Sequence, residues 1–234
     1  MRIKVVNPNT TPSMTALIGE CARAVAGPGV TVDATNPRLG PAAIECYVDD
    51  ALAVPGLLQE IADGEAAGYD GYVIACFGDP GLKAARELAR GPVVGIAEAG
   101  MRTAAYLGRG FSVVTTLART VGHAHDLAEE YGVARQCLGI HACEIPVLAL
   151  ETDPNARTTI LRACEEALAV DGSDAIVLGC AGMANLCYDL SSKLGVSVID
   201  GVAAATTTVE ALVRMGLTTG KLGEFAPHPR HSLV

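Results

Sequence analysis

The sequence predicts an α/β fold whose two halves repeat one arrangement of parallel strands and helices. The segment 70–82 (DGYVIACFGDPGL) is matched 104 positions later by the segment 174–186 (DAIVLGCAGMANL). In both copies an acidic residue and a short apolar run precede a cysteine, one further residue and a glycine, after which a helical pattern begins. An apolar run that ends in such a turn is typical of a buried parallel strand. Strands and helices alternate along the rest of the chain, which is the pattern of parallel α/β sheets.

The first half of the chain is predicted to contain four strands separated by helices. Thr11 and Pro12 indicate a helix start, because threonine caps helices and proline fits the first helical position. Gly27-Pro28-Gly29 ends that helix, and Pro55 is expected to bend the next long one. The predicted strands are 3–6, 30–35, the cysteine-bearing run after Asp70 and 93–96, and the predicted helices are 12–26, 44–67, 80–89 and 97–107.

The second half is predicted to repeat this order. Segments 111–116 and 195–199 resemble segments 3–8 and 91–96, so the internal similarity extends beyond the cysteine motifs. The tail from Leu217 is expected to be irregular. The predicted strands are 111–115, 138–142, 175–179 and 197–199, and the predicted helices are 118–131, 154–170, 184–194 and 202–215.

The composition excludes several classes of partner. Half of the 234 residues are apolar, with three phenylalanines and no tryptophan, which suits helices packed on parallel sheets more than an aromatic-rich binding surface. A chain of this length can form one large domain or two small lobes with a substantial core. The formal charge of −9 argues against nucleic acid and anionic membranes as partners.

The N-terminal segment and the cysteines indicate a cytoplasmic protein. The apolar run within residues 1–8 contains a charged residue and is too short for a signal peptide, and no run of eighteen apolar residues follows. None of the eight cysteines forms a Cys-x-x-Cys pair. In a reducing compartment we therefore expect thiols and not disulfides.

Cys76 and Cys180 are the strongest candidates for chemistry. Each is predicted at the carboxyl end of a buried strand, where α/β sheets place their active sites. The backbone N–H groups of the following turn are expected to lower the thiol pKa from its reference of about 8.5. The alternative is that both are small buried core residues. The other cysteines lack a matched partner or a glycine turn and are expected to be structural: Cys21, Cys46, Cys137, Cys143, Cys164 and Cys187.

Five polar residues are predicted at the same sheet edge as the cysteines. Asn7, Asn9 and Thr10 follow the first strand, and Thr115 and Thr116 follow its counterpart in the second half. Their amide and hydroxyl groups can hold a neutral polar ligand. Turn formation explains them equally well, because Asn and Thr are common in turns and caps.

Several charged residues have structural interpretations. Asp79 is expected to cap the helix that it precedes, and Met183 in the matching position means that Asp79 is not half of a symmetric catalytic pair. Glu45 follows the Gly40-Pro41 loop, from which it could orient a ligand, but a solvated carboxylate at a helix start is the favoured interpretation. His123 and His125 fall on different faces of a predicted helix, so they do not converge on a metal ion.

Two like thiols on two like halves suit racemisation at a carbon that bears an acidic proton. That reaction needs a base on one face and an acid on the other, and the two exchange roles with the direction of reaction. Backbone N–H groups of the Cys-x-Gly turns can hold the enolate oxygen. The sequence shows no Walker loop, dinucleotide fingerprint or Gly-x-Ser-x-Gly elbow, so we predict no cofactor and no metal.

At these residues the chain resembles the Asp/Glu racemase superfamily, and more closely its hydantoin racemase branch, which includes allantoin racemases. The matching segments are NPNT at 7–10, GPAAIE at 40–45, ACFGDPGL at 75–82, VVTT at 113–116, LGCAGM at 178–183 and IDGVAA at 199–204. The resemblance implies two pseudo-symmetric parallel-sheet lobes with the active site between them. Residues 1–98 plus 206–234 are expected to form the first lobe, and residues 99–205 the second.

The same resemblance implies a cofactor-independent mechanism with Cys76 and Cys180 as acid and base. It also implies a homo-oligomer, which the Ala-rich helices favour. The expected contacts to a small cyclic ureide come from side chains or backbone amides of Asn9, Phe77, Gly78, Thr115, Thr116, Ala181 and Gly182.

The residues after the second cysteine narrow the expected substrate. Ala181 and Met183 flank this region without the Thr or His that the superfamily's amino-acid racemases place near the second cysteine, so a neutral cyclic ureide is favoured. We therefore expect a racemase of 5-monosubstituted hydantoins, with allantoin racemisation as the alternative. An amino-acid racemase, a decarboxylase of the same superfamily that needs only one working cysteine, and a non-catalytic small-molecule binding protein are less favoured.

Overall fold

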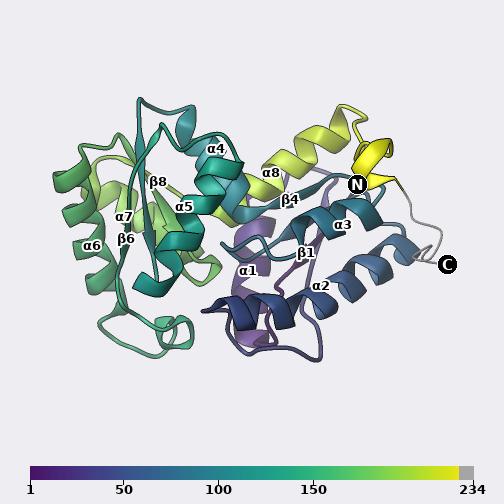
Figure 1. Cartoon of the computed structure of the whole chain (residues 1–234), viewed down its shortest axis with the longest axis horizontal. Coiled ribbons are helices and arrows are strands. Elements are labelled where there is room, and N and C mark those ends of the chain that lie inside the picture. The colour runs from purple at the N-terminus through teal and green to yellow at the C-terminus, as the bar shows by residue number, and fades with distance from the viewer. Residues whose placement is uncertain (227–234) are drawn as a thin grey trace.

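The computed structural model describes residues 1–226 and contains two four-stranded parallel sheets, one in each half of the chain. The sheets lie side by side along the long axis of the molecule, and helices flank each of them (Figure 1). This arrangement confirms the predicted fold class. His228 and His231, which belong to the predicted irregular tail, lie outside the described residues.

The first sheet has the strand order β2-β1-β3-β4, and its neighbouring strands are all parallel. Its central strands β1 and β3 are almost entirely buried, as expected for a sheet that helices cover on both faces. The elements of this half are β1 (Arg2–Val6), α1 (Pro12–Val25), β2 (Thr31–Thr35), α2 (Tyr47–Ala67), β3 (Gly71–Ile74), α3 (Leu82–Leu88), β4 (Val93–Gly95) and α4 (Ile96–Ala105).

The second sheet has the order β6-β5-β7-β8, which is the order of the first sheet repeated. The predicted internal repeat therefore extends to the topology of the strands. The elements are β5 (Phe111–Thr115), η1 (Ala118–Thr120), α5 (Val121–Glu130), β6 (Cys137–Ala142), η2 (Val147–Leu150), α6 (Ala156–Asp171), β7 (Ala175–Gly179), η3 (Ala181–Leu186), α7 (Cys187–Leu194), β8 (Ser197–Ile199), α8 (Gly201–Arg214) and η4 (Gly223–Phe225).

Helices α4 and α8 join the two sheets. α8 follows the second sheet but packs against α1, α4 and three strands of the first sheet. The two helices approach closely: a Cβ atom on Gly201 would lie 2.6 Å from the carbonyl oxygen of Ile96, and one on Gly100 would lie 3.5 Å from the Cα atom of Gly201. The lobe limits expected from the sequence fall inside α4 and α8, so the connections between the halves are packed helices.

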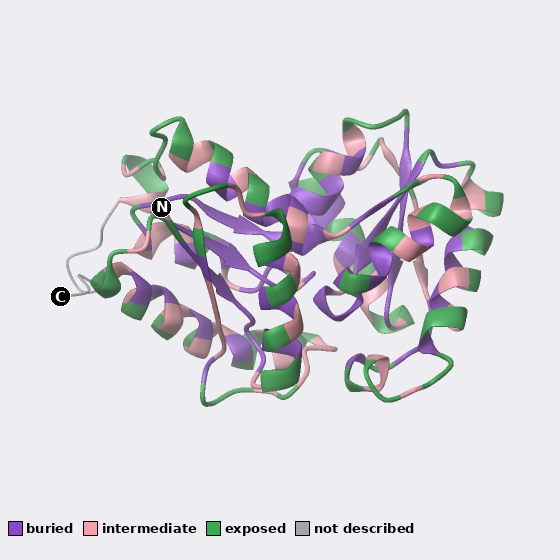
Figure 2. Cartoon of the chain, turned by 180° about the vertical axis from the view of Figure 1, so that it is seen from behind, coloured by how far each residue is buried: buried purple, intermediate pink, exposed green. Residues whose placement is uncertain are grey.

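The hydrophobic core runs continuously from one half into the other. Ile3 and Tyr72 of the first sheet are fully buried in the same cluster as Phe111 of the second sheet. A smaller cluster around Ile160 and Leu178 lies within the second half. Buried residues occupy the strands and the helix faces turned toward them, and exposed residues cover the outer helix faces (Figure 2). Close packing of this shared core therefore fixes the distance and the orientation between the carboxyl edges of the two sheets.

Some helix starts differ from the sequence-based expectation. α2 begins at Tyr47 and continues through Pro55 without a break, because packing of its buried face on the first half outweighs the local cost of proline. Thr11 occupies the N-cap position of α1, but its hydroxyl donates to the carbonyl of Ala42 (2.7 Å) and does not cap the helix. The helices expected at 118–131 and 184–194 open with the 3₁₀ turns η1 and η3.

Replacing Gly201 with alanine should destabilise the junction between the halves. The added methyl group would meet the backbone carbonyl of Ile96, and overpacking of this kind costs about 1–3 kcal/mol. Gly122→Ala in α5 is the matched control, because nothing lies within 4 Å of its added carbon. Urea unfolding should show a lower midpoint for Gly201→Ala only, and equal midpoints for the two variants would contradict the close approach of α4 and α8.

Candidate active site

A cavity of about 160 Å³ lies where the carboxyl ends of the two sheets face each other. Parallel strands bring the loops that follow them to one edge, and the loops after β1, β3, β5 and β7 all reach this cavity. A cavity of about 150 Å³ in another protein accommodates benzene, so the volume suits one small ring. The lining residues are Asn9, Met14, Ile44, Glu45, Cys46, Tyr47, Asp50, Ala75, Cys76, Phe77, Gly78, Thr115, Thr116, Arg119, Thr120, His123, Ala124, Val147, Gly179, Cys180 and Ala181.

Cys76 and Cys180 occupy equivalent positions in the cavity wall. Cys76 follows β3 and Cys180 follows β7, the matching strands of the two sheets. The N–H of Asp79 donates to the carbonyl of Cys76 (3.0 Å), and the N–H of Met183 donates to the carbonyl of Cys180 (3.1 Å). The two turns therefore close in the same way, and they bring both half-buried thiols to one cavity.

Burial raises the pKa of both thiols. Loss of contact with water disfavours the thiolate, and this effect exceeds all others: the pKa of Cys180 rises to about 12, and that of Cys76 also rises. The backbone amides of Gly78 and Gly182 donate toward the sulfur atoms of their own turns and oppose the rise in pKa. The expectation of a lowered pKa is therefore wrong, because one amide replaces less solvation than the cavity wall removes.

Asn9, Thr115 and Thr116 line the cavity together with the cysteines, whereas Asn7 and Thr10, expected at the same edge, do not. The side-chain oxygen of Asn9 accepts the N–H of Thr11 (2.9 Å), so Asn9 forms its own turn while its buried side chain reaches the cavity wall. The hydroxyl of Thr115 donates to the carbonyl of Gly179 (3.2 Å), which couples the ends of β5 and β7. Asn9 therefore both forms a turn and lines the cavity, so its two expected roles do not exclude each other.

The backbone positions expected to contact a ligand do not all face the cavity. Phe77, Gly78 and Ala181 line it, whereas Gly182 borders a second hollow of about 450 Å³ on the other side of its turn. The amides of Gly78 and Gly182 face the sulfur atoms. The amides of Phe77 and Ala181 are therefore the better placed of the four to meet a ligand.

Glu45 is not the solvated helix-start carboxylate that the sequence suggests. It lines the cavity, and its Oε1 atom accepts the N–H of Val147 in η2 at 2.6 Å. This hydrogen bond joins the loop before α2 to the second half of the chain. The two residues lie 102 positions apart, so no local sequence pattern indicates the contact.

Five further polar or aromatic residues line the cavity without having been predicted: Tyr47, Asp50, Arg119, Thr120 and His123. The Nε2 atom of His123 lies 3.1 Å from the carbonyl oxygen of Gly78, and its ring packs edge-on against Tyr47. Among the described residues, Asp50 Oδ1 has no hydrogen-bond partner, and burial raises the pKa of this carboxyl group. The spacing of His123 and His125 argues against a shared metal site, and of the two only His123 lines the cavity.

Asp79 caps a different helix from the one expected. α3 begins at Leu82 behind Gly81, so Asp79 is too early to cap it. Its carboxylate instead accepts the N–H groups of Ala97 (3.1 Å) and Glu98 (2.9 Å) at the start of α4. Asp79 thus caps a helix, as expected, but that helix is α4 and not α3, because the turn directs the carboxylate toward α4.

The eight cysteines are free thiols, and Cys46 differs from its expected structural role because it lines the cavity. Within residues 1–226 no group of three or more His, Cys, Asp or Glu side chains is placed to hold a metal ion. In the same part of the chain no helix has both the length and the apolar character needed to span a membrane.

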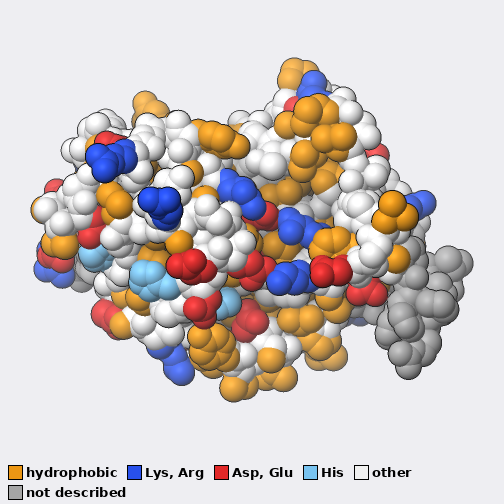
Figure 3. Space-filling view, turned by 45° about the horizontal axis from the view of Figure 1, so that its top comes forward, with side chains coloured by type: hydrophobic (Ala, Val, Ile, Leu, Met, Phe, Trp, Pro, Cys, Tyr) orange, Lys and Arg blue, Asp and Glu red, His pale blue; other side chains and the backbone are white. Residues whose placement is uncertain are grey.

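The surface carries charges of both signs. On the face shown in Figure 3, acidic and basic side chains are interspersed with apolar ones. A mixed surface on a chain with a net charge of −9 is unlike the basic stripe that polyanion-binding proteins present. The surface therefore favours a small-molecule substrate bound in the cavity over a polyanionic partner.

A family profile described as Asp/Glu/Hydantoin racemase matches residues 3–209. The chain belongs to the Asp/Glu/hydantoin racemase family. This result confirms the resemblance seen in the sequence and the predicted enzyme class, an isomerase of the racemase type. The match covers both sheets and both cysteine turns, so the cavity between them is part of the family's shared region.

Individual members of this family are similar over nearly the whole chain. A hydantoin racemase of Rhizobium meliloti is 51% identical over 231 residues, which are 98% of this chain and 95% of that protein. The structure of an allantoin racemase from Klebsiella pneumoniae matches with a TM-score of 0.96 at 50% identity, covering 98% of this chain and 94% of that one. Arylmalonate decarboxylase, at 18% identity and a TM-score of 0.63 with coverage of 91% and 92%, shares the fold.

Alkylation of the racemase by iodoacetamide should be slow at neutral pH and should accelerate well into the alkaline range. Only the thiolate reacts, and an ordinary thiol with a pKa of about 8.5 is almost fully ionised by about pH 9.5. Because burial raises the pKa of Cys76 and Cys180, their rates should still be rising there. Mass spectrometry of the two peptides measures this, and a plateau near pH 7 at either cysteine would contradict the raised pKa.

Proposed function

We propose that this racemase acts on 5-monosubstituted hydantoins and moves the C5 proton between two cysteines without a cofactor. The proposal is carried by one observation: Cys76 and Cys180 reach one cavity from equivalent turns of two related sheets. Similarity to a hydantoin racemase over nearly the whole chain supports the substrate class. The volume of the cavity, which suits one small ring, supports a compact cyclic substrate.

The reaction moves one proton off one face of C5 and another onto the opposite face. A cysteine thiolate takes the C5 proton, and the electron pair of the broken C–H bond moves to the neighbouring carbonyl, which becomes an enolate. The thiol of the other cysteine then donates its proton to C5 from the other side, and its sulfur becomes the thiolate. The carbon is inverted, and the two cysteines exchange roles in the reverse direction.

The reactive form of the pair is one thiolate and one thiol. A negative charge on Cys180 raises the pKa of Cys76, so ionisation of Cys180 disfavours ionisation of Cys76. The amides of Gly78 and Gly182 stabilise whichever sulfur carries the charge. Catalysis therefore requires only a single ionisation within the cavity.

The neutral polar groups of the cavity are proposed to hold the ring. Asn9, Thr115 and Thr116 offer amide and hydroxyl groups to the N–H and C=O groups of a cyclic ureide, which carries no formal charge. The amides of Phe77 and Ala181 are proposed to donate to the oxygen that becomes negative in the enolate. This division leaves the sulfur atoms free to approach C5 from two sides.

We also propose that the racemase works as a homo-oligomer in the cytoplasm. Large apolar side chains are exposed on the first turns of α2, where Tyr47 and Val48 are each 66% exposed. Clustered exposed apolar groups of this kind are typical of protein interfaces. The low fraction of charged residues, 18%, agrees with an extensive subunit contact.

Racemisation of allantoin is the second candidate. Allantoin carries a ureido group at C5, and the N–H groups of that substituent require acceptors. Asp50 Oδ1 is buried at the cavity without a partner among the described residues, and a carboxylate oxygen can accept such N–H groups. The 50% identity to an allantoin racemase of known structure also supports this substrate.

Other functions receive less support. A decarboxylation mechanism needs only one working cysteine, and here two share the cavity. A free amino acid is disfavoured because Ala181 and the fully buried Met183 follow Cys180, with no Thr or His in the same turn. A silent binding protein would leave the C5 proton of its ligand in place, which exchange experiments detect.

Polarimetry with enantiopure substrates tests the function directly. We expect the optical rotation of a 5-alkylhydantoin to decay to zero at the same rate with and without EDTA, because the cysteines and the substrate carbonyl supply the chemistry. Allantoin should be followed in parallel, and a faster decay with allantoin would favour the second candidate. Constant rotation with both substrates would contradict a racemase, and a loss of activity in EDTA that one metal restores would contradict cofactor independence.

Replacing either cysteine by serine should separate the reaction into two halves. A serine hydroxyl is a poor base near neutral pH, so net racemisation should fall by about 10²- to 10⁴-fold in both Cys76→Ser and Cys180→Ser. In deuterated water each variant should still exchange the C5 hydrogen of one enantiomer, because one cysteine remains. NMR should show opposite preferences in the two variants.

Cys21→Ser is the matched control for these variants. Cys21 lies on α1, is half-buried like the two cavity cysteines and does not line the cavity. Its replacement should leave racemisation unchanged. Normal racemisation by one of the two cavity variants, or loss of exchange with both enantiomers in both folded variants, would show that the symmetric two-cysteine mechanism is wrong.

A further inference from the structure

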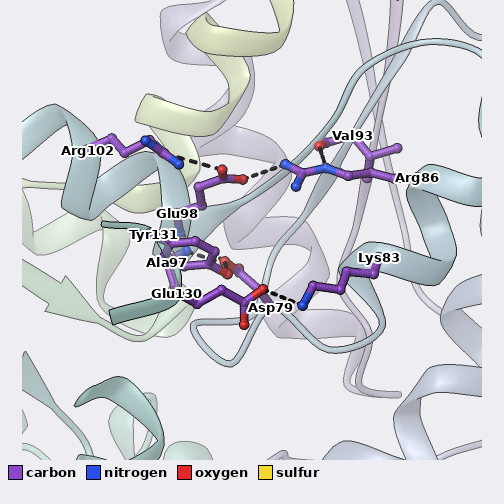
Figure 4. Close-up of polar contacts among 9 residues, drawn as sticks. All are labelled: Asp79, Lys83, Arg86, Val93, Ala97, Glu98, Arg102, Glu130 and Tyr131. Carbon is purple, nitrogen blue, oxygen red and sulfur yellow. Dashed lines mark hydrogen bonds and ion pairs between the residues drawn. The ribbon is translucent and has the colours of Figure 1, made fainter. Parts of the chain in front are cut away.

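The side chain of Asp79 links the turn that carries Cys76 to helices α4 and α5. Its carboxylate accepts the N–H of Ala97 (3.1 Å) and the N–H of Glu98 (2.9 Å) at the start of α4, and the Tyr131 hydroxyl at the end of α5 donates to it at 2.6 Å. These donors converge on one buried side chain (Figure 4). The backbone N–H of Asp79 also closes the turn that carries Cys76. One residue therefore fixes both the turn and its surroundings.

The packing around Asp79 leaves its carboxylate a single position. Its backbone lies in the left-handed region, with φ at 46°, which Asp tolerates better than most residues. Gly95 precedes α4, and a Cβ atom there would collide with the Asp79 carboxylate. α5 contacts the same turn a second time, because His123 Nε2 lies 3.1 Å from the carbonyl oxygen of Gly78.

Ion pairs hold the helices on either side of this carboxylate. In Figure 4, Arg86 of α3 pairs with Glu98 of α4, and Lys83 of α3 pairs with Glu130 of α5. Burial raises the pKa of Asp79 to about 6, while the hydroxyl and amide donors act to lower it. Asp79 is therefore a carboxylate at neutral pH, which makes its three hydrogen bonds charge-assisted and strong.

The second half of the chain lacks this tie. Met183 occupies the position of Asp79 and closes the Cys180 turn through its backbone only. α8, the counterpart of α4, is capped by its own Asp200, which accepts a backbone N–H of that helix at 2.7 Å. α4 begins behind Gly95 without a side-chain cap of its own. The capping carboxylate thus comes from the cysteine turn in one half and from the helix itself in the other.

We propose that Asp79 is a positioning residue that orients the thiol of Cys76, so that the two proton transfers of the racemase depend unequally on the surrounding scaffold. The proposal rests on the two-cysteine reaction proposed above. Asp79 does not line the cavity, so it acts through the turn and not by touching the substrate. Loss of its carboxylate frees the Cys76 turn from α4 and α5, while the Cys180 turn, which has no such tie, keeps its geometry.

A misplaced Cys76 thiol should slow only the proton transfer on its own side. In deuterated water, Asp79→Asn should slow C5 exchange by about 10- to 100-fold for the enantiomer that Cys76 deprotonates, since a displacement of about 1 Å can cost 100-fold. Exchange of the other enantiomer should stay within about twofold of the parent, because Cys180 is undisturbed. Net racemisation should slow equally from both enantiomers, because each direction uses both cysteines.

The experiment measures C5 exchange by NMR with each enantiomer separately. Cys180→Ser retains the exchange that Cys76 catalyses and so identifies the enantiomer in question. Asp79→Asn keeps the shape and tolerates a positive φ, but its amide nitrogen cannot accept a helix N–H. Tyr131→Phe removes one donor without altering the turn and should show a smaller effect with the same preference. Asp200→Asn, which makes the same charge change at the capping residue of the counterpart helix α8, is the matched control and should show no preference.

Slower exchange confined to the Cys76 enantiomer in Asp79→Asn and Tyr131→Phe, with none in Asp200→Asn, supports the proposal. Equal slowing of both enantiomers in folded Asp79→Asn, or unchanged exchange of both, overturns it. If Asp79→Asn does not fold, Tyr131→Phe decides by the same criterion. Absence of opposite preferences in the Cys76→Ser and Cys180→Ser variants would instead overturn the proposed function on which this inference depends.

Discussion

Removal of two thiols from water in one small cavity is the constraint on which the chemistry of this chain depends. Burial raises the pKa of Cys76 and Cys180, so the substrate-free cavity holds protonated thiols at neutral pH. One amide per turn, from Gly78 or Gly182, opposes this effect without cancelling it. Only a small fraction of these thiols is ionised at neutral pH, but the thiolate that forms is a strong base, because a raised pKa means a high affinity for a proton. Such a base suits a carbon acid next to a carbonyl.

Packing between the two halves of the chain fixes the positions of these two thiols relative to each other. The two sheets share one strand order, so their cysteine turns arrive as near copies. A continuous core and the close approach of α4 and α8 at Gly201 hold the copies together. Departures from symmetry are found around the turns, where the Asp79 side chain forms hydrogen bonds with α4 and with Tyr131 at the end of α5, while Met183 forms a hydrogen bond only through its backbone and buries its side chain in the core. The proposed two-cysteine reaction would therefore use two similar turns whose surroundings differ.

The repeat and the alternation of apolar runs were sufficient to predict the fold, because strand burial and helix periodicity are local properties of the sequence. The cavity was only partly predictable. Cys76 and Cys180 carried a duplicated motif, whereas Glu45 and Asp50 reach the cavity from the loop and helix before the first cysteine strand through contacts made only in the folded chain. The predicted direction of the thiol pKa shift was wrong for a similar reason. The sequence shows the turn that follows each cysteine, but it does not show how deeply the sulfur atom is buried. Asp79 was expected to cap its own helix, and its true partner depends on tertiary packing.

In the proposed mechanism the two sulfur atoms approach one carbon from opposite sides. A crystal structure of the chain with a bound hydantoin-like ring that is planar at the position of C5 tests this most directly. We expect the sulfur atoms of Cys76 and Cys180 on opposite faces of that carbon, each at a near-attack distance of about 3–3.5 Å, with the adjacent ring oxygen near the amides of Phe77 and Ala181. Both sulfur atoms on one face of the ring, or only one of them within reach, would contradict it.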